Sequence, residues 1–213
     1  GNRLKQSDGE RDLGVIISSS GKPSEQCLAA AKKANRMLGL IKRNFKSRSK
    51  DVVVRLYKTL VRPRLEYCVQ SWCPYLQKDI AVLEKVQRRA TKMILACRTD
   101  SYEDRLKYTE LTSLECRRRR GDMIEVFKLL NGVEQIDYNI LIQRAEKTGR
   151  RGHSYKLVKH RARLDLRKFY FSNRVVNTWN SLPESVVVAG TVNSFKARLD
   201  AYIRAKGSGW FVR

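Results

Sequence analysis

The sequence predicts a mostly α fold, with a short β element at the N-terminus, a helical bundle, and a small mixed helical C-terminal subdomain. Apolar residues recur at three- and four-residue steps through most of the chain, which is the period of amphipathic helices. Helix-capping serines precede several of these stretches, and glycine or proline follows them. With 213 residues, 42% of them apolar, the chain is long enough to bury a real core.

The N-terminal element is predicted as one short strand from Glu10 to Ser18, because Leu13–Ile17 is an almost continuous apolar run. Serines and a glycine follow it and form a loop that closes at Pro23.

The first helix is predicted from residue 24 to about residue 45, with Ser24 as its cap. Its buried face is expected to carry the apolar positions Leu28, Ala31, Ala34, Leu38, Ile41 and Phe45. Lysines and arginines fall on the other faces, so this is a basic amphipathic helix.

A second helix is expected from about Lys50, where Pro63 either kinks it or starts a new segment and Pro74 ends the continuation. The expected buried stripe is Val53, Leu56, Tyr57 and Leu60. A third helix is predicted over Asp79–Cys97, with its lysines and arginines outward.

Ser101 begins a capping-box-like pattern, which predicts a short helix to about Tyr108. The next helix is expected to start after Ser113, to expose the run Arg117–Arg120 and to stop at Asn131–Gly132. Helices therefore dominate through Gly132.

Beyond Val133 the pattern changes to a basic, glycine-broken loop over 147–153 and a weak strand pattern over 155–159. Helices are expected again over Phe169–Trp179 and Val192–Ala205, with a turn at Pro183 between them. We therefore expect three parts: the β element at 1–20, a helical domain at 21–135, and a basic C-terminal subdomain at 136–213.

The formal net charge of +24 predicts a polyanionic partner, because solvated helix faces normally mix both signs of charge. Nucleic acid, RNA or DNA, is the expected partner. The candidate nucleic-acid-binding residues are basic residues on outward helix faces and in the 147–153 loop: Lys32, Lys33, Arg36, Lys42, Arg43, Arg62, Arg64, Arg88, Arg89, Lys92, Arg117, Arg118, Arg119, Arg120, Arg150, Arg151 and His153.

The sequence assigns no catalytic residue, no metal ligand and no cofactor. Two-metal phosphoryl transfer needs clustered carboxylates, whereas the aspartates are scattered, and cap chemistry explains Glu103–Asp104 better. His153 has no visibly matched nucleophile or acid, so a phosphate contact or a structural role is expected. Five irregularly spaced cysteines indicate free thiols, and with no signal peptide or apolar span an intracellular protein without membrane contact is expected.

Several stretches in order resemble one family, the reverse transcriptase polyprotein of non-LTR retrotransposons, in particular the chicken-repeat-1 type related to the jockey group. The resemblance covers nearly the whole chain and rests on these segments: Glu10–Ile17, Leu60–Tyr67 with Trp72 and Pro74, Leu83–Lys92, Arg117–Asp122, Arg150–His153, and Trp179–Pro183 followed by Phe195–Lys196.

The resemblance implies a C-terminal fragment that begins after the Phe/Tyr-x-Asp-Asp motif of the catalytic palm. Residues 1–20 would finish the palm, the helical domain would be thumb-like and clamp template and primer, and the C-terminal subdomain would contact element RNA or target DNA. The chain would not be an enzyme by itself, and Mg²⁺ would be needed only by the full-length RNA-directed DNA polymerase. Nuclear and cytoplasmic ribonucleoprotein locations follow from this resemblance.

Two other functions are open at this point. A truncated or domesticated element protein would use its basic faces as an interaction module for acidic protein partners. An independent nuclease is the weakest interpretation, because the carboxylate cluster is missing.

Overall fold

The computed structural model describes residues 7–145 and 152–207, and helices make up most of them, so the predicted mostly α fold with an N-terminal β element is confirmed. Two compact units, Gly1–Glu115 and Cys116–Arg213, divide the chain, and each has a hydrophobic core of its own. This division differs from the expected one at residue 136, because the apolar residues of α7 (Leu114–Leu130) from Met123 onward belong to the second core.

The N-terminal β element is a hairpin, not the single strand predicted over Glu10–Ser18. Strands β1 (Gly9–Asp12) and β2 (Val15–Ser18) pair antiparallel, with Asp12 opposite Val15. Leu13 and Gly14 between them both have positive φ, 44° and 84°, the geometry of a tight two-residue hairpin loop. The prediction failed because Leu13 is an apolar residue in a position that usually takes asparagine, aspartate or glycine.

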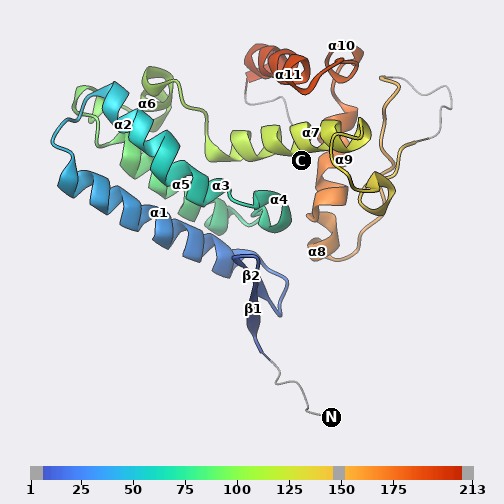
Figure 1. Ribbon diagram of the computed structural model, residues 1–213, viewed down its shortest axis with the longest axis horizontal. Helices are drawn as coiled ribbons and strands as arrows, with labels where there is room; N and C mark the ends of the chain where they lie inside the picture. Colours follow the sequence, from blue (N-terminus) through green and yellow to red (C-terminus); the bar gives the residue numbers. More distant parts are fainter. Residues whose placement is uncertain (1–6, 146–151, 208–213) are drawn as a thin grey trace. The chain divides into compact units, whose positions relative to one another are not determined.

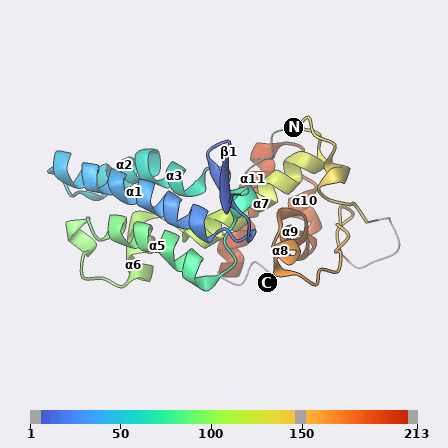
Figure 2. The ribbon, with the colours of Figure 1, turned by 90° about the horizontal axis from the view of Figure 1, so that it is seen from below.

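Helices α1 (Ser24–Asn44) and α5 (Gln77–Thr91) lie side by side in the first unit and run in the same direction (Figures 1 and 2). Near their starts the Ser24 hydroxyl donates to Asp79 Oδ2 at 2.7 Å, so this serine links the two helices and does not cap α1 as expected. Farther along, Arg89 Nη1 donates to Asn35 Oδ1 at 3.0 Å. Small buried side chains of α1 allow close packing of this helix: Cys27, Ala30, Ala31 and Ala34.

The segment around Pro63 is helical throughout, but one turn of it is π-helical. Helix α2 (Lys50–Leu56) continues into η1 (Tyr57–Val61) and then α3 (Arg62–Glu66). The Arg62 amide bonds to the carbonyl five residues back, on Tyr57, immediately before the proline that has no amide to donate. This wider turn buries Val61 and leaves Leu60 exposed, contrary to the predicted stripe.

The rest of the first unit consists of short helices: α4 (Val69–Trp72), η2 (Leu95–Cys97) and α6 (Tyr102–Thr109). The predicted helix Asp79–Cys97 ends earlier, at Thr91. Ser101 caps α6 as predicted, since its hydroxyl oxygen accepts from the Asp104 amide at 3.2 Å. Trp72 is buried, and its indole donates to the Tyr67 carbonyl at 2.8 Å.

A buried hydrogen-bond network fixes α5 against its neighbours. Tyr57 donates to Gln87 Oε1 at 2.6 Å, and Gln87 Nε2 donates to the Tyr102 hydroxyl at 2.9 Å. Burial raises the pKa of both tyrosines, so both remain neutral donors and acceptors. Because every one of these groups is satisfied, the basic face of α5 has a rigid support.

The second unit contains α7 from Cys116 onward, η3 (Tyr138–Ile140), α8 (Asp165–Lys168), α9 (Phe171–Asn180), α10 (Glu184–Val187) and α11 (Val192–Lys206). Gly132, at φ 64°, lies two residues past the end of α7, where the sequence placed the stop. Three aromatic rings pack together in its core: Phe195 stacks on Phe127 with centroids 4.3 Å apart and lies 5.9 Å from Trp179.

Polar contacts in the second unit are also buried. Arg174 donates to both oxygens of Asp122, at 2.9 Å each, and connects α9 to α7.

The weak strand pattern at 155–159 corresponds to a single antiparallel bridge between Arg144 and Leu157.

Candidate nucleic-acid interface

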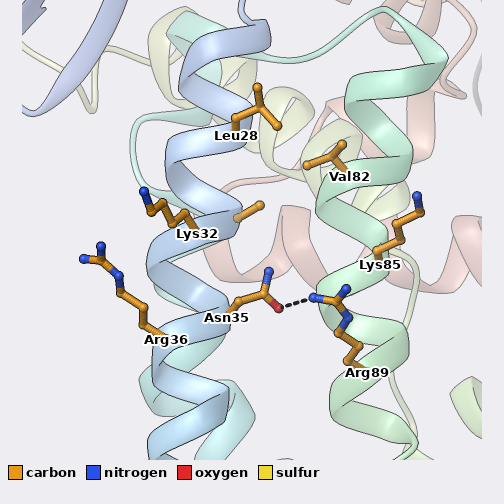
Figure 3. Close-up of a pocket in the computed structure, with 8 residues that line it drawn as sticks. Leu28, Lys32, Asn35, Arg36, Val82, Lys85 and Arg89 are labelled. Atoms are coloured by element: carbon orange, nitrogen blue, oxygen red, sulfur yellow. Dashed lines mark hydrogen bonds between the residues drawn. The ribbon is translucent and has the colours of Figure 1, made fainter.

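A basic groove runs between α1 and α5 in the first unit. Its first part, about 670 Å³, is lined by Leu28, Ala31, Lys32, Asn35, Arg36, Val82, Lys85 and Arg89. Figure 3 shows Leu28 and Val82 turned toward each other between the helices, whereas Lys32 and Arg36 extend from the outer side of α1. Lys85 extends on the outer side of α5. The floor is therefore apolar at Leu28 and Val82, the Asn35–Arg89 hydrogen bond spans it farther along, and its borders are cationic.

The groove continues toward the ends of both helices. This second part, about 530 Å³, shares Asn35 and Arg89 with the first, and its remaining lining residues are Leu38, Gly39, Lys42, Arg48, Lys92, Met93, Leu95 and Arg98. We call the two parts together the α1–α5 groove. None of its lining residues is aspartate or glutamate. Such a surface attracts anions along its whole length.

A smaller hollow of about 340 Å³ lies between α5 and the segment that leads into α6. It shares Lys85, Arg89, Lys92 and Arg98 with the α1–α5 groove and adds Arg88, Thr99, Asp100, Tyr102 and Arg105. The Arg88 guanidinium lies 3.9 Å from the Tyr102 ring centroid, so the ring holds its orientation. The exposed cations of α5 thus border hollows on two sides.

The structure brings six predicted binding residues together at these hollows, all of them exposed: Lys32, Arg36, Lys42, Arg88, Arg89 and Lys92. Lys33, Arg43 and Arg64 are exposed but line none of the three. Arg62 is half-buried, with its Nε 3.7 Å from Glu66 Oε2.

Among the polar and charged groove residues, the sequence prediction of the binding site missed four: Asn35, Arg48, Lys85 and Arg98. Lys85 was detectable, because it lies four residues before Arg89 on the same helix face. Arg48 follows the end of α1 and donates to the Lys42 carbonyl at 2.7 Å, a contact that depends on how the chain turns there.

The run Arg117–Arg120 is not the exposed basic surface that the sequence suggested. Arg118 is 3% exposed, because it lies on the same face of α7 as the buried Asp122 and Val126, four and eight residues farther on. Arg120 is paired with Asp200 of α11, with Nη2 2.8 Å from Oδ2. Arg117 and Arg119 are half-buried. Arg120 therefore links α7 to α11, and Arg118 belongs to the buried part of the second unit.

Replacing Arg117, Arg118, Arg119 and Arg120 by alanine is therefore expected to destabilise the second unit. The buried Arg118 side chain is removed from α7, and Asp200 loses its partner Arg120. Thermal unfolding followed by circular dichroism should show a melting temperature at least about 5 °C lower. An unchanged melting temperature together with weaker nucleic-acid binding would instead support the sequence prediction, in which Arg117–Arg120 form an exposed basic surface.

Two of the remaining predicted residues, Arg150 and Arg151, lie outside the described residues. His153 is 4% exposed and is a structural residue, not a phosphate contact. Its Nδ1 accepts from the Tyr155 amide at 3.2 Å, so Nε2 carries the proton and donates to the Trp179 carbonyl at 2.9 Å. This geometry fixes the neutral imidazole, and burial lowers its pKa below the ordinary value of 6.5.

Stability should consequently depend on pH through His153. The unfolded chain binds a proton near pH 6.5 while the folded chain resists it, so stability is full above this pH and falls as the pH drops below it. Melting temperatures measured between pH 7.5 and pH 5.5 should decline in the parent chain and less so in His153→Gln. The variant His160→Gln, at an exposed position, should keep the decline.

The described residues contain no group of three or more His, Cys, Asp or Glu side chains arranged to hold a metal ion. In the same part of the chain no helix is long and apolar enough to cross a membrane. The five cysteines, all within the described residues, are not joined in disulfides, and Cys27 and Cys97 are buried.

Comparisons with protein-family models, with curated protein sequences and with solved structures found no match to this chain.

Proposed function

We propose that this chain is a nucleic-acid-binding protein that grips the sugar-phosphate backbone through the α1–α5 groove. The observation that carries the proposal is the convergence of exposed lysines and arginines from two helices on a groove without a lining carboxylate. Cations on fixed helix faces release counterions from phosphates when they bind, which favours association without reading the sequence.

The resemblance to non-LTR retrotransposon reverse transcriptases supports a more specific role. In this role the first unit acts as a thumb-like clamp on template and primer or on element RNA. The chain positions nucleic acid, whereas the carboxylates and Mg²⁺ for phosphoryl transfer belong to the palm of a full-length polymerase. The rigid support of α5 by Gln87 and Tyr102 suits a clamp, because it keeps the cations at fixed spacing.

A salt titration tests the proposal. If five to eight phosphates are neutralised, the logarithm of the association constant should fall against the logarithm of salt concentration with a slope of about −4 to −7. Fluorescence anisotropy with RNA, duplex DNA and an RNA–DNA hybrid, each at several salt concentrations, gives this slope. A slope near zero for all three would contradict nucleic-acid binding.

The same titration separates the alternative function, an interaction module for acidic proteins. Polyglutamate offers charge without phosphates, so it should compete only weakly with the oligonucleotides. Displacement of nucleic acid by polyglutamate at equal charge concentration would favour the protein-binding alternative.

A further inference from the structure

We propose that the α1–α5 groove takes a single strand, with its bases on the apolar floor and its phosphates at the cationic borders. This inference rests on the proposed function and specifies its ligand. Leu28 has 57% of its surface exposed although it lies on the groove side of α1, where the sequence placed it in the core. Val82 faces it from α5 (Figure 3). Phosphate binding alone does not require this exposed apolar surface.

The apolar floor distinguishes the two forms of nucleic acid. A duplex stacks its base faces inside and presents sugars and phosphates outward, so it offers nothing apolar to Leu28, Ala31 and Val82. A single strand has free base faces, which bury favourably against apolar surface while its backbone follows a basic path.

The close packing of the two helices also favours a single strand over a duplex. Helices α1 and α5 pack directly on each other, with axes typically about 8–10 Å apart, and the Asn35–Arg89 hydrogen bond crosses between them. A depression between two packed helices is narrower than a duplex but admits a strand that lies along it.

Cations border this floor along both helices, so a strand meets charge from either side. Lys32 and Arg36 extend from the outer side of α1, and Lys85 from the outer side of α5. In the adjoining hollow Tyr102 covers one face of the Arg88 guanidinium, which is exposed, so the other face is open to a base or a phosphate.

The test compares an oligothymidine of about 12 nucleotides with an abasic oligomer of the same length, which keeps the phosphates and removes the bases. The parent chain should bind the oligothymidine about tenfold more tightly, the factor expected from burying roughly 50 Å² of apolar surface. The matched duplex should bind less tightly than the single strand.

Leu28→Ser should lower the affinity for oligothymidine severalfold and leave the abasic affinity unchanged. Leu40→Ser is the control, because Leu40 is another exposed leucine of α1 that lines none of the hollows. Circular dichroism should show both variants folded, since both side chains are exposed.

Equal affinity for the two oligomers, equal loss on both in Leu28→Ser, or tighter binding of the duplex would overturn the single-strand inference and leave phosphate binding standing. The absence of salt-dependent binding to every oligomer would overturn the proposed function itself, so the two failures are distinct.

Discussion

Replacing Lys32, Arg36, Lys85 and Arg89 together by alanine is expected to lower the affinity for nucleic acid by roughly 10³-fold at ~0.1 M salt. Each phosphate contact contributes about 0.7 to 0.9 to the salt slope, so losing four should reduce its magnitude by about 3 to 4. All four side chains are exposed and line one groove, so the fold should remain intact. Anisotropy titrations between low and high salt measure both quantities.

The matched control removes the same charge elsewhere in the first unit: Lys33, Arg43, Lys58 and Arg64, which are exposed and line none of the three hollows. This variant has the same net charge as the first. Its salt-dependence slope should nevertheless change by less than the contribution of one phosphate contact, about 0.7 to 0.9. Equal losses in the two variants would mean that total charge, and not the groove, determines binding.

Trp179→Ala is expected to cost about 3–5 kcal/mol of unfolding free energy. The side chain is 1% exposed, packs edge-on against His153 and near Phe195, and donates its indole N–H to the Tyr155 carbonyl at 2.7 Å. Truncation therefore leaves a cavity and removes the hydrogen bond to the half-buried Tyr155 carbonyl. Urea denaturation followed by circular dichroism measures the loss.

Tyr170→Ala provides the comparison, because this aromatic residue of the same unit is 50% exposed and should change stability by less than about 0.5 kcal/mol. If Trp179→Ala instead unfolds like the parent chain but binds single strands more weakly, the ring is a stacking platform and its assigned core role is wrong.

Sequence periodicity identified the helices best where the buried residues follow a regular 3.6-residue repeat. The helix predicted from Ser24 was found over Ser24–Asn44, and most of its lysines and arginines are exposed as expected. Five of the six candidate binding residues at the hollows come from this helix and α5, where amphipathic patterning alone decides which side faces solvent, and Lys92 directly follows α5.

Periodicity failed where the backbone departs from the α-helical repeat. Val53, Tyr57, Val61 and Leu65 are all buried at four-residue intervals, and an ideal α-helix would rotate them progressively off one face. The π-helical turn at Tyr57–Val61 takes up that rotation. A regular repeat of 3.6 residues per turn places Leu60, three residues after Tyr57, on the buried stripe. The sequence prediction was wrong at Leu60 for this reason.

Charge runs were the second source of error. Four consecutive arginines at 117–120 must point in different directions around a helix, so at least one falls on the buried side whatever their charge. Here Arg118 does, and only tertiary partners on other elements, such as Asp200 for Arg120, show what role these residues have. The basic composition predicts a polyanionic partner, but it does not indicate which arginines are placed to contact one.

Because α1 and α5 run in the same direction, the two ends of the groove differ. Both helix starts, with their partial positive charge, lie at the end where Ser24 bonds to Asp79, and both helix ends lie beyond Asn35 and Arg89. The apolar floor at Leu28 and Val82 is closer to the end of the groove where both helices start. The Lys42 and Lys92 cations are closer to the opposite end. A nucleic-acid strand is itself directional, so in the proposed complex its two orientations would meet different contacts, and we expect the groove to favour one strand polarity over the other.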